Sequence, residues 1–224
     1  MKFVSYPDQD MMMIDVANQL AGALNEHVML GERASFAVPG GTTPGPIFDV
    51  LCAADLDWSL VDILPTDERR VPPDHPRSNE RLIRERLMVN RAAAARFVSI
   101  VPSGDSPGAD SARLPQVLDG LLPITVLLLG MGADMHTASL FPGSAQLAAA
   151  LHDDAPALMP VEAPGAPEPR ITLTAPVLDG AMSKHLVITG AEKRAALERA
   201  QKLDDPMQAP ICAVLGGTTV HWAA

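Results

Sequence analysis

Residues 124–136 read ITVLLLGMGADMH, an apolar run that opens into glycines and polar side chains. A run in which apolar and polar residues do not alternate indicates a strand that is covered on both faces, as strands of parallel sheets are. We therefore expect a buried strand over 124–129. Ligands bind beyond the carboxyl ends of such strands. The polar side chains that follow, Asp134 and His136, are consequently the first candidates for chemistry.

Predicted helices and strands alternate on both sides of this segment. Apolar residues at helical spacing predict helices over 11–30, 78–87, 111–122 and 191–203, with a further helix beginning at Pro44. Short apolar runs predict strands over 35–38, 61–64, 97–101, 170–173 and 185–189. Residues 155–169 are expected to form loops around a short strand, and 211–222 fit no clear pattern. The alternation predicts the α/β class, as a doubly wound, mostly parallel sheet with helices on both faces, built as a single domain over residues 1–224.

The composition indicates a folded protein and excludes several other classes. Of the 224 residues, 47% are hydrophobic, which is enough for a sizeable core. No apolar stretch reaches the ~18 residues of a membrane span, and the first residues lack the apolar run of a signal peptide. Cys52 and Cys212 are isolated, without the spacing of a disulfide framework or a metal finger. We therefore expect a cytoplasmic protein that does not interact with a membrane.

The net charge of −10 restricts the ligands of this protein. Nucleic acid is disfavoured as a partner, because a phosphate backbone requires a basic face. An anionic small molecule would be repelled at long range, so a few basic residues would have to create a local positive field at its site. Arg170 and Lys193 each begin or follow a predicted strand, so both can point into one cleft. Taken singly, each is an ordinary surface cation.

The turn Gly40-Gly41-Thr42-Thr43-Pro44 joins a predicted strand to a predicted helix. Thr43 can cap this helix, with Pro44 in its first turn. Backbone N–H groups and hydroxyls of such a turn can hold a phosphate at the helix N-terminus. The segment is neither a Walker loop nor a GxGxxG dinucleotide motif. A tight turn that only caps the helix is the alternative.

Two polar clusters follow predicted strands. Asp67-Glu68-Arg69-Arg70 ends the strand over 61–64, and a solvated charged loop is the ordinary interpretation of it. The second cluster contains Asp134 and His136. A histidine beside a carboxylate can act as a general base near neutral pH, because the acid orients and stabilises the imidazolium. The alternative for this pair is a capping aspartate and a structural histidine.

Metal ligation and nucleophilic catalysis are further hypotheses for these residues. Asp134, His136 and the loop residue His75 could supply oxygen and nitrogen ligands to a metal. No HExxH motif, paired cysteines or histidine cluster supports such a site, so we expect no metal. Ser139 lacks the GxSxG motif of a serine nucleophile.

Five segments together resemble the 6-phosphogluconolactonases, a family related to the glucosamine-6-phosphate deaminases. They occur in the family's order and span most of the chain: PGGTTP (39–44), LPTDERRVPPDHPRSN (64–79), LLLGMGADMHTASLFPGS (127–144), RITLT (170–174) and ITGAEK (188–193). The resemblance implies the α/β sheet of sugar-phosphate isomerases and lactonases, no cofactor, and hydrolysis of 6-phosphogluconolactone to 6-phosphogluconate in the oxidative pentose phosphate pathway. The implied partner is a phosphorylated sugar lactone, and the choice between monomer and homodimer is left open.

The resemblance also implies roles for individual residues. His136 matches the catalytic histidine of the family, and Asp67 and Asp134 match acids of the same site. The residues that match the substrate and phosphate side are Gly40, Gly41, Thr42, Thr43, Arg69, Arg170 and Lys193. Which basic residue contacts phosphate and which contacts sugar stays open.

Two residues depart from the family's pattern. Met135 replaces the glycine that usually precedes the histidine, and it would be strained by roughly 1–2 kcal/mol if its φ is positive. Pro39 replaces the usual serine and removes one hydroxyl and one backbone N–H. Either change could alter activity or substrate preference.

Two other functions have to be weighed. A glucosamine-6-phosphate deaminase or isomerase would share Asp67, Asp134 and His136, but that branch continues with an Asn-Glu pair for ring opening. This chain instead continues TASLFPG (137–143), with no acid before Asp153. A sugar-phosphate sensor without catalysis is the other alternative, and steady-state turnover would separate it from both enzymes.

Overall fold

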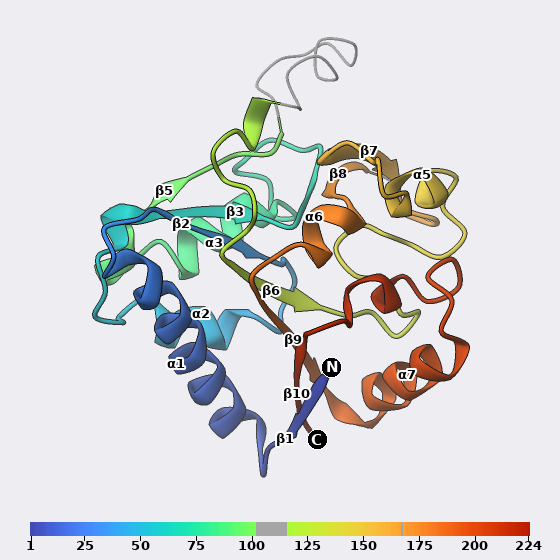
Figure 1. The fold of residues 1–224 in the computed structure, drawn as a ribbon, viewed down its shortest axis with the longest axis horizontal. Coiled ribbons are helices and arrows are strands. Elements are labelled where there is room, and N and C mark those ends of the chain that lie inside the picture. The colour runs from blue at the N-terminus through green and yellow to red at the C-terminus, as the bar shows by residue number, and fades with distance from the viewer. Residues whose placement is uncertain (102–115, 167) are drawn as a thin grey trace.

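A sheet of seven strands forms the centre of the computed structural model, which describes residues 1–101, 116–166 and 168–224 (Figure 1). Its order is β1-β10-β9-β6-β2-β3-β5, and neighbouring strands pair in parallel. The strands are β1 (Lys2–Ser5), β2 (Ala34–Val38), β3 (Val61–Pro65), β5 (Arg96–Phe97), β6 (Val126–Gly130), β9 (Ser183–Thr189) and β10 (Thr219–Ala223). The mostly parallel α/β sheet expected from the sequence is confirmed.

Helices cover both faces of this sheet. In Figure 1, α1 and α2 lie on one side of the central strands and α7 lies on the other. The helices are α1 (Gln9–Val28), α2 (Gly45–Leu51), α3 (Asn79–Arg86), α5 (Leu147–Leu151), α6 (Ala175–Asp179) and α7 (Gly190–Leu203), with 3-10 helices η1 (Trp58–Leu60), η2 (Asn90–Ala94) and η3 (Pro210–Val214). Among the described residues, no helix combines the length and the apolar character needed to cross a membrane.

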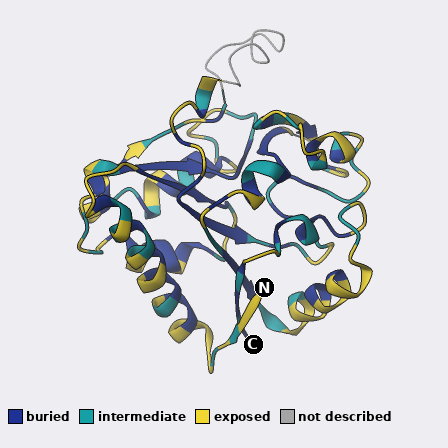
Figure 2. Ribbon diagram, in the orientation of Figure 1, coloured by how far each residue is buried: buried dark blue, intermediate teal, exposed yellow. Residues whose placement is uncertain are grey.

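Strand β6 explains why the apolar run of residues 124–129 shows no alternation. Successive side chains of a strand point to opposite faces of the sheet. Val126 and Leu128 pack in the apolar cluster that contains the buried sides of α1, α2 and α3. Leu127 and Leu129 pack in the cluster of α5, α6 and α7. Both faces are therefore buried, as the dark blue central strands of Figure 2 show.

A second sheet has three antiparallel strands in the order β4-β8-β7. These strands are β4 (Asp67–Arg69), β7 (Leu158–Glu162) and β8 (Pro169–Leu173). The interpretation of Asp67 to Arg69 as a solvated charged loop is wrong, because Asp67 pairs with Thr172 and Arg69 pairs with Arg170. A three-residue strand made of charged residues has no apolar pattern that could reveal it. The pairing brings Arg170 beside Arg69, although the two residues lie far apart in the sequence.

Some element boundaries also differ from the expectation. The strand expected over 97–101 is reduced to Arg96–Phe97, which pairs with Asp62 and Ile63 of β3 at the edge of the sheet. Residues 211–222, which fitted no pattern, contribute to η3 and β10, and β1 at the N-terminus adds an edge strand beside β10. The helix expected over 111–122 falls partly on residues 102–115, which lie outside the described residues.

The strand order reverses between β2 and β6. Strands β2, β3 and β5 follow one another toward one edge, and the chain then returns to the other side of β2 as β6 and continues through β9 and β10. Ligands of open α/β sheets bind in the crevice beyond the carboxyl ends of the strands at such a point. Here the segments at those ends are residues 39–44 and 131–136.

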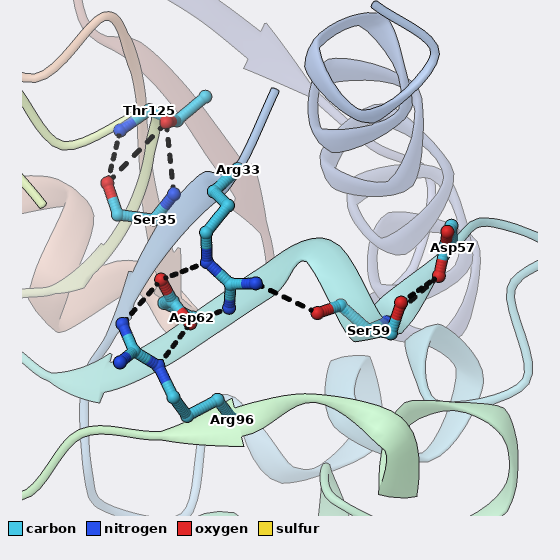
Figure 3. Close-up of polar contacts among 7 residues, drawn as sticks. All are labelled: Arg33, Ser35, Asp57, Ser59, Asp62, Arg96 and Thr125. Carbon is cyan, nitrogen blue, oxygen red and sulfur yellow. Dashed lines mark hydrogen bonds and ion pairs between the residues drawn. The ribbon is translucent and has the colours of Figure 1, made fainter. Parts of the chain in front are cut away.

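A buried aspartate secures the opposite end of the sheet (Figure 3). Asp62 of β3 is 1% exposed and accepts hydrogen bonds from the guanidinium groups of Arg33 and Arg96. Burial alone would raise the pKa of the Asp62 carboxyl, but the bonds from the two arginines lower it below its ordinary value. Ser35 and Thr125 join β2 to the start of β6, because each backbone N–H donates to the hydroxyl of the other residue at 3.0 Å.

A hydrogen-bonded chain of side chains runs from β9 through β10 to α1. The Ser183 hydroxyl lies 3.1 Å from His185 Nε2, and His185 Nδ1 lies 3.0 Å from His221 Nε2. His221 Nδ1 lies 2.9 Å from Tyr6 Oη, whose hydroxyl donates to Asp15. Because Tyr6 uses its proton on Asp15, its oxygen accepts from His221, and every partner is satisfied when both imidazoles are neutral. Burial lowers the pKa of both histidines, and that of His221 falls to about 4, with a smaller contribution from His185.

We expect these hydrogen-bonded histidines to make the protein less stable in mild acid. An unfolded histidine has a pKa of about 6.5, so between about pH 6.5 and pH 4 the unfolded state binds a proton that folded His221 does not bind. The free energy of unfolding therefore falls as the pH falls, by about 2 kcal/mol for His221 alone between pH 7 and pH 5. Urea unfolding at the two pH values measures the loss.

Two variants control this measurement. His221→Gln carries no group that titrates in this range, so its free energy of unfolding should depend less on pH than that of wild type. His152→Gln removes an exposed histidine and should leave the pH dependence unchanged. A wild-type free energy of unfolding that is equal at pH 7 and pH 5 would contradict the prediction.

Candidate active site

A cleft of about 270 Å³ includes the segments that follow β2 and β6, where the strand order reverses. Every site residue expected from the sequence lines it except Asp134, which contacts His136 instead. The lining residues are Pro39, Gly40, Gly41, Thr42, Thr43, Pro44, Asp67, Arg69, Asn79, Gly130, Met131, Gly132, His136, Ala138, Arg170 and Lys193. The fold thus brings together candidate residues from five separate segments of the sequence.

His136 and Asp134 form a hydrogen-bonded pair. His136 Nδ1 lies 2.5 Å from Asp134 Oδ1, and the same oxygen accepts from the His136 backbone N–H at 3.3 Å. An ionised carboxylate only accepts hydrogen bonds, so Nδ1 carries the proton of the neutral imidazole and Nε2 is the basic nitrogen. The His136 side chain is 30% exposed and lines the cleft. This arrangement can take a proton from a molecule bound there.

Two positions of the turn that carries this pair are conformationally or sterically restricted. Met135 has a φ of 68°, so the methionine does lie in the left-handed region, where a side chain costs roughly 1–2 kcal/mol. Its surroundings hold it there, because its carbonyl accepts from the Ile211 N–H at 3.1 Å and its side chain packs against the cluster of α5, α6 and α7. At Gly132 the restriction is space, because a Cβ there would lie 2.3 Å from the His136 ring and 2.4 Å from Asp134 Oδ1.

Asp67 is buried, and its carboxylate is already engaged. Its Oδ2 accepts a 2.6 Å hydrogen bond from the Ser139 hydroxyl and forms an ion pair of 3.5 Å with Arg170. Ser139 is 1% exposed, and its backbone N–H donates to the Thr172 hydroxyl. A buried hydroxyl that is bound to a carboxylate in this way is unsuited to be a nucleophile. The contacts instead connect Asp67, Arg170 and the loop after β6.

Asn79 connects three parts of the cleft, and sequence reasoning did not single it out. Its Oδ1 accepts from Arg69 Nη1 at 3.0 Å, and its Nδ2 donates to the carbonyl of Asp67 at 2.7 Å. A Cβ at Gly40 would lie 1.8 Å from Asn79 Oδ1, so glycine is required for this close approach. The asparagine therefore fixes Arg69 against the turn after β2. No spacing rule could have found it, because its partners lie on β4 and in the turn after β2, which are separate from it in the sequence.

Glu68 places Asn79 at the start of α3. Its carboxylate accepts from the backbone N–H groups of Asn79 and Glu80, at 2.8 Å and 2.6 Å, and from the Ser78 hydroxyl at 3.1 Å. A negative charge is stabilising at a helix N-terminus. Burial raises the pKa of Glu68, and these hydrogen bonds oppose that shift. The capping holds Asn79 in place and with it the contact to Arg69.

The glycine-rich turn after β2 differs from the expectation in its helix cap. Helix α2 begins at Gly45, and no side chain caps it. The expected cap by Thr43 is wrong, because Pro44 already has helical dihedral angles (φ −76°, ψ −15°) and leaves Thr43 outside the helix. Gly41 has a φ of 89°, which favours glycine. Thr42 and Thr43 line the cleft instead.

The two arginines of the cleft each have a side-chain N–H donor without a partner among the described residues. The Nε atoms of Arg69 and Arg170 are buried and have no partner within the described part of the chain. Burial lowers the pKa of Arg170, which Asp67 opposes, although an arginine stays protonated at neutral pH. Lys193 lies in the first turn of α7 and lines the cleft. An anion in this cleft would meet three cations.

The residues considered for metal binding do not gather. Within the ranges that the structure describes, no three His, Cys, Asp or Glu side chains form a group that could hold a metal ion. His75 Nδ1 accepts from the backbone N–H of Arg77 at 3.1 Å.

The structure adds one aromatic neighbour of His136 that sequence reasoning missed. The ring centroids of Phe141 and His136 lie 4.3 Å apart.

Several known proteins are similar to this chain over most of its length. The chain matches the family of glucosamine-6-phosphate isomerases/6-phosphogluconolactonase over residues 7–222. A 6-phosphogluconolactonase of Rhizobium meliloti is 39% identical over 215 residues, which cover 93% of this chain and 91% of the relative. One of Pseudomonas aeruginosa is 36% identical over 214 residues, covering 92% and 88%. The crystal structure of a 6-phosphogluconolactonase from Shewanella baltica superposes with a TM-score of 0.94 at 35% identity, covering 100% of this chain and 97% of that one.

Proposed function

The chain belongs to the glucosamine-6-phosphate isomerase/6-phosphogluconolactonase family, and from this membership we propose that it hydrolyses 6-phosphogluconolactone to 6-phosphogluconate in the oxidative pentose phosphate pathway. Relatives of that name are 33% to 39% identical to it over most of its length. The observation that carries the proposal is that one cleft contains both a base and three cations. His136, which is paired with Asp134, lines the same cleft as Arg69, Arg170 and Lys193.

The three cations suit a phosphorylated substrate. A net charge of −10 would repel an anion at long range, and a local cluster of cations offsets that repulsion. A charge-assisted hydrogen bond to phosphate contributes roughly 1.5–3 kcal/mol. We assign Arg170 and Lys193 to the phosphate, with Arg69 and the turn Gly40 to Thr43 beside it. Binding energy from this remote group would orient the lactone over the base.

His136 would act as the general base. Its Nε2 accepts a proton from water while the water oxygen forms a bond to the lactone carbonyl carbon, and the carbonyl oxygen becomes an oxyanion. The tetrahedral intermediate then breaks the bond to the ring oxygen. The imidazolium returns its proton to that oxygen, so the product carries a hydroxyl and a carboxylic acid, which ionises in water.

The two aspartates would orient their neighbours and exchange no proton with the substrate. Asp134 fixes the tautomer of His136 and stabilises the imidazolium that forms. Asp67 holds Arg170 through their ion pair, and its carboxylate also accepts from the hydroxyls of Ser139 and Thr66. A lactone is a reactive ester, so this route requires no covalent intermediate.

We also propose the cytoplasm as the compartment of this reaction. Cys52 and Cys212 are both free thiols, as expected in a reducing compartment. Cys52 is buried inside the apolar cluster of α1, α2 and α3.

The proposal predicts turnover of 6-phosphogluconolactone well above its spontaneous hydrolysis. The assay follows acid release at neutral pH, with the spontaneous rate subtracted, and glucosamine-6-phosphate is offered in parallel. Turnover of the lactone alone supports the proposal. Turnover of the amino sugar alone would favour a deaminase, and binding of either compound without turnover would favour a sensor.

A further inference from the structure

We propose that Phe141 is a positioning residue of this site, whose ring holds His136 and Arg170 in a fixed relation to each other. The inference rests on the proposed function, because it takes His136 as the base and Arg170 as a substrate-binding cation. The ring centroids of Phe141 and His136 lie 4.3 Å apart at an interplanar angle of 34°. The Arg170 Cζ lies 5.2 Å from the centroid of the same Phe141 ring. One aromatic ring therefore contacts both groups.

Phe141 is not explained as part of the hydrophobic core. Among the described residues, it belongs to neither of the two apolar clusters that flank the sheet. Phe36 and Phe48, by contrast, are fully buried in one of these clusters. Phe141 is only half-buried, and its ring lies against a histidine and an arginine of the cleft. We therefore explain the position of Phe141 by its contacts with these two residues.

The backbone fixes where the ring lies. The Ser144 N–H donates to the carbonyl of Phe141 at 3.1 Å, and Gly143 has a φ of 77°. A proline followed by a glycine with positive φ and closed by this bond is a type II turn, with Phe141 as its first residue. Such a turn restricts the backbone from which the ring projects. The ring is therefore a defined surface for its neighbours to pack on.

The two partners each need a second point of attachment. His136 is held at Nδ1 by Asp134, and this bond alone leaves the ring free to tilt about it. Contact with Phe141 on the ring restricts that tilt, so that Nε2 keeps one direction. Arg170 has a 3.5 Å ion pair with Asp67, and its Nε has no partner among the residues that the structure describes. The electron-rich face of an aromatic ring attracts a guanidinium and limits its movement.

The test compares Phe141→Leu, Phe141→Met and Phe141→Tyr with wild type. Loss of the ring should lower kcat and raise KM for 6-phosphogluconolactone, each by about 3- to 20-fold, since both partners lose a contact. Phe141→Tyr keeps the ring and should stay within about two-fold of wild type in both constants. The control is Phe97→Leu, because Arg84 lies over the Phe97 ring at 4.5 Å outside the cleft. This control should leave kcat and KM unchanged.

Double variants separate the two effects. In an Arg170→Ala background, Phe141→Leu should no longer raise KM, and in a His136→Ala background it should no longer lower kcat. The proposal is overturned if Phe141→Leu and Phe141→Met both match wild type, if Phe141→Tyr fails to restore activity, or if the effects are unchanged in both backgrounds. Wild type without turnover would overturn the proposed function instead. Weaker binding of 6-phosphogluconate by Phe141→Leu would then still support the positioning of Arg170.

Discussion

His136→Ala is expected to lower kcat for 6-phosphogluconolactone by about 10²- to 10⁴-fold, the usual contribution of a general base. The reason is geometric, because Asp134 occupies Nδ1 and leaves Nε2 as the one basic nitrogen of the ring. Alanine removes that nitrogen. KM should change much less, since the phosphate is assigned to other residues. Steady-state kinetics with the spontaneous rate subtracted measure both constants.

Two controls accompany this variant. Its thermal midpoint and its affinity for 6-phosphogluconate show whether the fold and the cleft persist. His152→Ala is matched to it, because His152 also lies two residues from an aspartate, with its Nδ1 3.9 Å from Asp154 Oδ2, but is exposed outside the cleft. This control should retain wild-type turnover. If folded His136→Ala keeps more than about a third of wild-type kcat, His136 is not the base.

Arg170→Ala and Lys193→Ala are each expected to raise KM by about 10- to 100-fold, because each removes a charge-assisted contact with the phosphate. Arg170 lines the cleft, so its guanidinium can meet a ligand bound there. Unphosphorylated gluconolactone should be a poor substrate of wild type and should respond little to either change. The comparison of KM for the two lactones measures the contribution of the phosphate.

The two variants differ in what else they disturb. Arg170→Ala leaves the buried Asp67 without its ion pair, so its thermal midpoint has to be measured as well. Lys193 is half-exposed at the start of α7, and Lys193→Ala is therefore the cleaner test. Lys202→Ala, in the last turn of the same helix, is the control for lost positive charge. Equal increases of KM with both lactones would show that Arg170 and Lys193 support the fold and do not bind phosphate.

Much of the site could be predicted because its parts lie at the ends of strands. The apolar run before Gly130 identified a strand buried on both faces, and the topology of parallel sheets placed Asp134 and His136 at its carboxyl end. The strain at Met135 was expected from the resemblance, because the family usually has a glycine at this position, and the φ of 68° agrees with that expectation. The cap by Thr43 was predicted wrongly, because Pro44 reaches helical dihedral angles first and no sequence rule decides between the two residues.

The sequence by itself determined the class of the sheet, the location of the cleft and the His136–Asp134 pair, because these depend on patterns within short segments. Only the tertiary structure decided that Arg69 pairs with Arg170 across an antiparallel sheet, and that Asn79 reaches the space that Gly40 leaves open. It also decided that Phe141 contacts both His136 and Arg170. These contacts join residues far apart in the chain. Their geometry depends on how whole elements pack, which no local pattern of side chains encodes.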